Sequence, residues 1–265
     1  MESSVAPILT ITDLRLDLGH RPVLKGISLS VHKGEHLAIV GANGSGKSTL
    51  LRAMARLVKA SSGAVSVMGR PLSGIDRRTL ARFIAYVPQA HFERIPFTVL
   101  EYLRLARYPY LDGWSGRRPE DESAVERALR DTEISHLAKR PANQLSGGEA
   151  QKVLIAAALT QETPILLLDE ATAFLDVKHK SDIHLLLDKL NRRHRKTILQ
   201  VTHDLNHAAL SCRRIIALKA GQAIFDGAPK RFMTPEVLSA VYAAPFDFVT
   251  HPATGAKVVI PKVTP

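Results

Sequence analysis

Short apolar runs alternate with longer amphipathic segments along most of this chain of 265 residues. Apolar runs of about four to eight residues are typical of buried strands, and apolar residues that recur every three or four positions are typical of helices. The expected strands are Ile8–Leu18, Ile27–Val31, His36–Val40, Ala64–Met68, Phe83–Val87, Ile165–Leu168 and Thr197–Val201. The expected helices are Leu50–Leu57, Arg77–Ala81, Val99–Arg107, Ser123–Leu129, Gly147–Leu159, His179–Arg193 and Asn206–Ser211. This alternation predicts an α/β core with a largely parallel sheet.

The segment between residues 97 and 152 departs from the alternation because its spacing is helical throughout, apart from the polar loop Tyr110–Glu122. We therefore expect a helical subdomain inserted into the α/β core. The sequence contains no internal repeat and no linker rich in Gly, Ser or Pro. We treat the whole chain, residues 1–265, as a single domain.

The last part of the chain predicts a hairpin followed by a short extension. Arg214–Leu218 and Gln222–Phe225 are expected to pair as antiparallel strands. Residues 228–265 form a C-terminal extension. Thr234 is expected to cap a helix within it, and two short strands are expected within Phe246–Pro261.

Composition places the chain among ordinary globular proteins. Hydrophobic residues make up 45% of it, which is enough for a sizeable core and excludes general disorder. No stretch reaches the roughly 18 apolar residues that a membrane helix needs. We also find no pattern of a signal peptide at the start. Cys212 is the only cysteine, so an intramolecular disulfide is excluded, which fits the cytoplasm.

The charge balance points to anionic partners. Lys and Arg number 36 against 25 Asp and Glu, a formal net charge of +11. Such an excess favours polyanions. It does not distinguish among nucleotides, nucleic acid and an anionic membrane surface.

One segment carries a phosphate-binding pattern between a strand and a helix: Gly41-Ala42-Asn43-Gly44-Ser45-Gly46-Lys47-Ser48-Thr49. Its glycines let successive backbone N–H groups curl around a phosphate chain, and the following helix adds the positive end of its dipole. Lys47 is expected to reach the β- and γ-phosphates, and the Ser48 hydroxyl to ligate Mg²⁺. The alternative is a glycine-rich turn that matches by chance, which the strand–loop–helix context opposes.

Two carboxylates end the apolar run Ile165–Leu168. At the carboxyl end of a buried strand, Asp169 is placed to hold the hydration shell of Mg²⁺, and Glu170 to polarise an attacking water. Acidic residues after a strand are also common helix caps. The pair gains weight from the phosphate loop elsewhere in the chain.

A second helix begins after Leu145-Ser146-Gly147-Gly148-Glu149. The unpaired backbone N–H groups at the start of this helix would form a second phosphate-binding site. The simpler interpretation is a capping box, with Ser146 as the cap and Glu149 three residues later.

The order of these motifs resembles the nucleotide-binding subunit of ATP-binding cassette (ABC) transporters over essentially the whole chain. The order is the phosphate loop, Val87-Pro88-Gln89, the helical segment, Leu145–Glu149, Asp169-Glu170, Leu175-Asp176 and Thr202-His203-Asp204. The resemblance implies a P-loop NTPase core with a largely parallel sheet, an antiparallel β subdomain and an inserted helical subdomain.

The resemblance also implies roles for single residues. Two copies meet head to tail, and each ATP is held by the phosphate loop of one copy and by the signature segment Ser146–Glu149 of the other. Gln89 contacts Mg²⁺ and the attacking water, Asp176 lies at the dimer seam, and His203 contacts the γ-phosphate. The implied cofactors are ATP and Mg²⁺.

Within the family, the chain is most similar to ATPases of importers for iron–siderophore complexes, haem and cobalamin. This implies two integral-membrane permease subunits, an indirect partnership with a substrate-binding protein, and a peripheral position on the cytoplasmic face of the inner membrane. Four positions depart from the usual pattern: Leu18, Ala106, Glu149 and Ala171. Leu18 replaces an aromatic ring that stacks on adenine, and Glu149 adds a negative charge near the nucleotide.

The alternative class is a soluble ABC ATPase that acts on nucleic acid in repair or translation, which the net charge of +11 keeps open. Translation-type members carry two cassettes, and repair-type members carry long coiled-coil or zinc-bearing insertions. This chain has one cassette, no heptad run and no cysteine pair, so no nucleic acid is expected.

Overall fold

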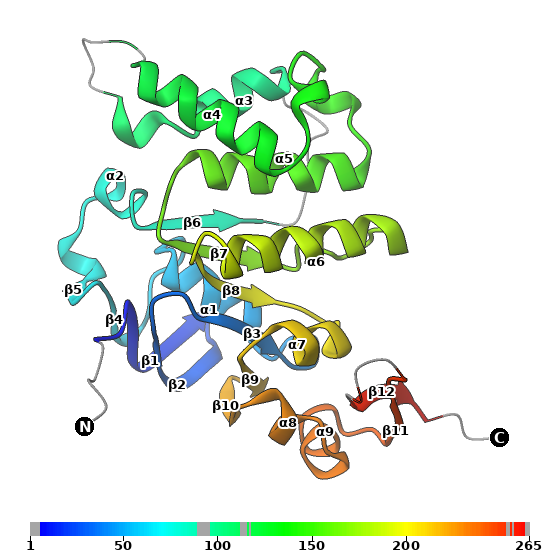
Figure 1. Cartoon of the computed structure of the whole chain (residues 1–265). Helices are drawn as coiled ribbons and strands as arrows, with labels where there is room; N and C mark the ends of the chain where they lie inside the picture. The colour runs from blue at the N-terminus through cyan, green and yellow to red at the C-terminus, as the bar shows by residue number, and fades with distance from the viewer. Residues whose placement is uncertain are drawn as a thin grey trace. The chain divides into compact units, whose positions relative to one another are not determined.

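The computed structural model describes residues 6–88, 96–111, 116, 118–252, 255 and 257–262. The chain divides into two compact units (Figure 1). The first unit joins Met1–Leu72 to Ile198–Pro265, and the second unit is Ser73–Thr197.

An antiparallel sheet in the first unit has the strand order β2-β1-β4-β5. Its strands are β1 (Leu9–Leu18), β2 (Arg21–Val31), β4 (Ser62–Val67) and β5 (Arg70–Pro71). The strand β2 begins six residues before the expected Ile27. Pro22 and Gly26 are unfavourable in strands, so the sequence pattern does not predict a strand there. A two-residue turn lets Leu18 pair with Arg21, and pairing with β1 then extends the strand back to Arg21.

A second sheet of the first unit positions the phosphate loop. It contains β3 (His36–Val40), β8 (Thr197–Val201), β9 (Arg214–Lys219) and β10 (Gln222–Gly227). The strand β3 runs parallel to both β8 and β9, and β10 pairs with β9 as the expected antiparallel hairpin. All five residues of β3 are buried, as its continuous apolar run predicts.

Helices complete the first unit. They are α1 (Lys47–Met54), α7 (Leu205–Ser211), α8 (Pro229–Phe232) and α9 (Pro235–Tyr242). The C-terminal extension ends in the expected pair of short strands, β11 (Phe246–Thr250) and β12 (Lys257–Pro261). The Thr234 side chain caps α9 by accepting a hydrogen bond from the backbone N–H of Val237, as predicted.

The second unit contains a parallel strand pair and five α-helices among its described residues. The strands are β6 (Ile84–Val87) and β7 (Ile165–Asp169). The helices are α2 (Arg77–Leu80), α3 (Val99–Leu105), α4 (Pro119–Asp131), α5 (Gly147–Thr160) and α6 (Val177–Arg192). Short 3₁₀ turns are found at Leu72–Gly74, Tyr108–Tyr110, Ser135–Leu137 and Ala142–Gln144. The helices α3, α4 and α5 pack against one another (Figure 1).

The helix α4 starts four residues before the expected Ser123, inside the segment predicted as a polar loop. Proline is favoured at a first helical position, and acidic side chains are favoured in a first turn. The Asp121 carboxylate also accepts the backbone N–H of Arg118, at 3.0 Å, which closes the cap. These end signals outweigh the polar composition of the segment.

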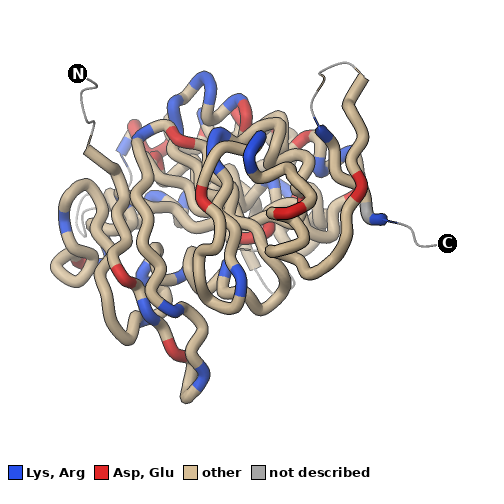
Figure 2. The backbone as a smooth tube through the Cα atoms, turned by 90° about the horizontal axis from the view of Figure 1, so that it is seen from below, with Lys and Arg blue, Asp and Glu red and all other residues tan. Residues whose placement is uncertain are grey.

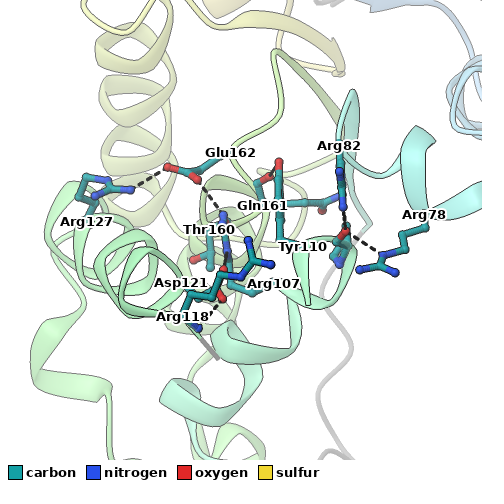
Figure 3. Close-up of polar contacts among 11 residues, drawn as sticks. Arg78, Arg82, Arg107, Tyr110, Arg118, Asp121, Arg127, Thr160, Gln161 and Glu162 are labelled. Atoms are coloured by element: carbon teal, nitrogen blue, oxygen red, sulfur yellow. Dashed lines mark hydrogen bonds and ion pairs between the residues drawn. The ribbon is translucent and has the colours of Figure 1, made fainter. Parts of the chain in front are cut away.

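A buried ionic cluster around Arg107 holds the helices of the second unit together (Figure 3). The Arg107 guanidinium donates to the Asp121 carboxylate at 2.7 Å, to the Thr160 carbonyl at 2.8 Å and to Glu162 at 2.8 Å. It also stacks 4.0 Å from the ring centre of Tyr110. Burial raises the pKa of Asp121, but hydrogen bonds from the Arg118 backbone and from Arg107 outweigh it and lower that pKa overall.

Replacing Arg107 with Met is expected to lower the free energy of unfolding by about 3–5 kcal/mol, because Asp121 would keep a buried charge without its cation. Urea titration followed by circular dichroism measures this. The matched control is Arg127→Met, whose half-exposed guanidinium pairs with the other oxygen of Glu162. That exposed pair should cost less than about 1 kcal/mol. Equal losses from the two variants would contradict the role given to Arg107.

The α/β class expected from the sequence is confirmed, with a mostly parallel arrangement of the buried strands, an antiparallel β portion and helical segments.

Candidate functional site

The phosphate loop leads from β3 into α1 in the first unit. Three of its glycines, Gly41, Gly44 and Gly46, have positive φ values of 144°, 75° and 103°. A Cβ atom at Gly41 would lie 2.2 Å from the carbonyl oxygen of Leu218, so no larger residue fits there. The N-terminus of α1 has no side-chain cap, because Gly46 occupies that position. Its backbone N–H groups suit a phosphate, so the loop fits a nucleotide.

The Lys47 ammonium is held inside this loop. The residue is 5% exposed, and its Nζ donates to the carbonyls of Gly41 at 2.9 Å and Ala42 at 3.1 Å. A buried cation at an uncapped helix N-terminus is a strong attractor for anions. The side chains of Ser48 and Thr49 follow on the first turn of α1 and are partly buried.

The structure brings His203 to the same edge of the sheet as the phosphate loop. The strands β3 and β8 are parallel with Ile39 opposite Val201, so both chains leave the sheet at its carboxyl edge. His203 is exposed there. The next residue, Asp204, caps α7 by accepting the backbone N–H of His207 at 2.8 Å. This position suits a side chain that contacts a phosphate group.

Asp169 and Glu170 lie at the carboxyl end of β7 in the second unit. Asp169 is 5% exposed, and its Oδ2 accepts a hydrogen bond from the Tyr86 hydroxyl at 2.8 Å. Glu170 has a φ of 53°, a left-handed conformation that is strained for a residue with a side chain. A buried carboxylate at a strand end is an oxygen donor of the kind that Mg²⁺ prefers, so Asp169 fits that ion.

Sequence reasoning missed Tyr86 as a partner of Asp169. Tyr86 lies opposite Leu167 in the parallel pair β6–β7, two residues before Asp169, so its side chain can reach the end of β7. Gln89, predicted to contact Mg²⁺ and the attacking water, follows this strand but lies outside the described residues.

The signature segment forms the capping box expected from its sequence. The Ser146 hydroxyl accepts the backbone N–H of Glu149 at 3.3 Å, and the Glu149 carboxylate accepts the backbone N–H of Ser146 at 2.8 Å. Gly147 and Gly148 begin α5. A Cβ atom at Gly148 would lie 2.2 Å from the His179 ring, so this glycine is required by packing.

His179 links the signature segment to Asp176. Asp176 caps α6, and its two carboxylate oxygens contact the backbone N–H and the Nδ1 of His179, each at 2.8 Å. These hydrogen bonds lower the pKa of Asp176, and the one from the His179 backbone has the larger effect. Sequence analysis did not assign His179 a role. Its spacing gives no signal, because the contact to Gly148 depends on how α5 and α6 pack.

The negative charge of Glu149 is paired. Its Oε1 lies 3.0 Å from the Arg140 guanidinium. The Ser146 backbone N–H and Arg140 together lower the pKa of Glu149, so it stays ionised at neutral pH. The departure from the usual pattern at this position is therefore balanced by a neighbouring cation.

Three further observations bear on function. Leu18 is 54% exposed at the end of β1, so an apolar surface is available there. Within the described residues, no helix has the length and apolarity to cross a membrane, and no cluster of His, Cys, Asp and Glu is arranged to hold a metal ion. Figure 2 shows basic and acidic residues interleaved along the backbone.

Comparison with known proteins gives a consistent picture. Residues 24–173 match the sequence profile of the family described as ABC transporter. The hemin import ATP-binding protein of Streptomyces coelicolor is 42% identical, over 95% of this chain and 89% of that protein. The iron(3+)-hydroxamate import ATP-binding protein of Bacillus subtilis is 37% identical, over 95% of this chain and 94% of that protein. A solved structure of an inward-facing, metal-chelate type ABC transporter superposes with a TM-score of 0.85 at 25% identity, over 97% of this chain and 98% of its own.

Proposed function

The chain belongs to the ABC transporter family as one of its ATP-hydrolysing subunits, and on this premise we propose that it powers the import of iron–siderophore complexes, haem or cobalamin. The observation that carries the proposal is the phosphate loop, in which a buried Lys47 lies at the uncapped N-terminus of α1. The cargo class is supported by the hemin and iron-hydroxamate import relatives, which align over nearly the whole chain.

In the first unit, the residues act on the phosphates. Gly41–Thr49 wraps the phosphate chain with backbone N–H groups, and Lys47 exchanges its carbonyl partners for the β- and γ-phosphate oxygens. His203 donates to the γ-phosphate from the neighbouring strand end. Ser48 of this unit, with Gln89 and Asp169 of the second unit, would hold Mg²⁺, which would neutralise charge on the phosphates.

In the second unit, the residues act on the water. Glu170, which follows the end of β7 with a left-handed backbone, orients and polarises the attacking water. Asp169 is fixed for its role by the hydrogen bond from Tyr86.

Two copies of the chain form the working ATPase. The signature segment Ser146–Glu149 of one copy binds the ATP held by the phosphate loop of the other. Gly147 is exposed at the start of α5, so its backbone N–H is accessible to phosphate. Asp176 lies at the seam, and its bonds to His179 couple the seam to the signature segment of the same copy.

This arrangement predicts the effect of unpairing Glu149. Arg140→Ala would leave an unbalanced carboxylate facing the partner's ATP, so about three- to tenfold more ATP should be needed for dimerisation. Adding Glu149→Gln should restore the wild-type requirement, because glutamine keeps the cap without the charge. Light scattering against ATP concentration measures both. No rescue by the second change would mean that Arg140 acts in another way.

The partners that follow are two integral-membrane permease subunits and, through them, a substrate-binding protein. The chain would therefore lie on the cytoplasmic face of the inner membrane. Affinity purification of the tagged chain from detergent-solubilised membranes tests this. Membrane proteins with many spans should co-purify in stoichiometric amounts, and recovery of nucleic acid alone would contradict the proposal.

A further inference from the structure

The C-terminal extension shares a hydrophobic core with the strand that leads to the phosphate loop. Ala38 and Val40 of β3 are fully buried in one cluster with Leu238 and Val241 of α9. Val259 of β12 joins the same cluster, and the Asn206 side chain bonds both backbone groups of Val259, at 2.8 and 3.1 Å. The extension is thus part of the support under the loop.

The last residue of α9, Tyr242, directs its hydroxyl toward the first residue of that loop. Its ring packs edge-on against Phe246, with centroids 5.8 Å apart. Its hydroxyl oxygen is buried and makes no hydrogen bond of good geometry with any described residue. Burial raises the pKa of Tyr242 to about 12, and the nearby backbone N–H of Gly41 opposes this rise. The phenol therefore stays protonated across the neutral range.

Gly41 joins Tyr242 to the functional lysine. Its backbone N–H lies near enough to the Tyr242 hydroxyl to oppose the rise of that pKa, and its carbonyl accepts a hydrogen bond from the Lys47 ammonium at 2.9 Å. The carbonyl of Leu218 leaves no room for a Cβ atom at Gly41. A small shift of this residue therefore moves the acceptor that positions Lys47.

A second tie fixes α9 beside the loop. The Lys219 ammonium, at the end of β9, donates to the carbonyl of Ala240 in α9. In the turn that follows β9, the Gly221 N–H donates to the Ser45 carbonyl of the phosphate loop at 3.1 Å. The helix, the turn and the loop thus form one connected set.

We propose that Tyr242 is a positioning residue for the phosphate loop. Its buried hydroxyl oxygen accepts a hydrogen bond from the Gly41 N–H when nucleotide binds. The C-terminal extension thereby sets the position from which Lys47 contacts the phosphates. The inference rests on the proposed function, since it gives Tyr242 a part in the same nucleotide site. A buried hydroxyl without a partner is unfavourable, so a hydrogen bond that forms with nucleotide favours the bound state.

Tyr242→Phe tests the proposal because it removes only the hydroxyl and keeps the ring on Phe246. The Kd for fluorescently labelled ADP should rise about three- to tenfold, which is the effect expected from the loss of one neutral hydrogen bond. The thermal midpoint of the nucleotide-free protein should stay the same or rise, since an unsatisfied buried group is lost. A merely structural tyrosine would do the reverse, with a lower midpoint and an unchanged Kd, and that result would overturn the inference.

The matched control is Tyr110→Phe, which removes a formed hydrogen bond to the Gln161 carbonyl in the second unit. It should lower the midpoint slightly and leave the Kd unchanged. In a Lys47→Ala background, Tyr242→Phe should lose most of its effect on the Kd, because it acts through the same loop residue. Full additivity of the two changes would also overturn the inference. Wild-type protein that bound no nucleotide would instead refute the proposed function.

Discussion

Lys47→Ala and Glu170→Gln are both expected to stop ATP hydrolysis, at different steps. Removing Lys47 takes away the cation for the β- and γ-phosphates and leaves the carbonyls of Gly41 and Ala42 without their donor. Glu170→Gln removes the base alone, so turnover should fall by at least about 100-fold while ATP still binds. Phosphate release measures turnover, and gel filtration with ATP measures dimerisation. Only the Glu170→Gln variant should dimerise.

An exposed lysine provides the control. Lys33 lies in the turn between β2 and β3 on the surface of the first unit, and Lys33→Ala should keep the wild-type rate. Turnover by Glu170→Gln at the wild-type rate would show that another group is the base. ATP-driven dimerisation by Lys47→Ala would show that the lysine is not needed to hold the phosphates.

Mixed dimers are expected to show that Ser146 acts on the partner's ATP. When one copy carries Lys47→Ala and the other Ser146→Arg, both changes fall on the same composite site and the second site is intact. When one copy carries both changes and the other is wild type, each site is damaged once. The first dimer should keep roughly half of the wild-type activity, and the second should lose nearly all of it, because each damaged site lacks a group that holds the phosphates.

Differently tagged chains, purified through both tags in turn, yield each mixed dimer free of the homodimers. Preparations that contain only the Lys47→Ala chain or only the Ser146→Arg chain are the reference, and both should be inactive. Equal rates for the two arrangements would rule out the head-to-tail dimer.

Local signals in the sequence predicted much of the fold. The run His36–Val40 is apolar after its first residue, and it forms a fully buried strand with the expected bounds. The box of Ser146 and Glu149 begins α5 at the expected residue, Gly147, because both cap partners are only three positions apart. The family resemblance is confirmed by the match to the family profile. It could be recognised from one sequence because its motifs are short segments in a fixed order.

The rest depended on contacts between distant segments. The strand β2 extends back to Arg21 because pairing with β1 overrides Pro22 and Gly26. Tyr86 reaches Asp169, and His179 reaches Gly148, only after strands and helices have packed. No spacing rule joins residues so far apart in the chain.

The central claim is that ATP hydrolysis by this chain drives import. Uptake of labelled ferric siderophore, haem and cobalamin into cells that lack the chain tests it most directly, with the wild-type or the Glu170→Gln chain supplied in trans. We predict that the wild-type chain restores uptake of at least one of the three compounds and that Glu170→Gln restores none. Uptake that Glu170→Gln supports equally well, or that never depends on the chain, would contradict the account.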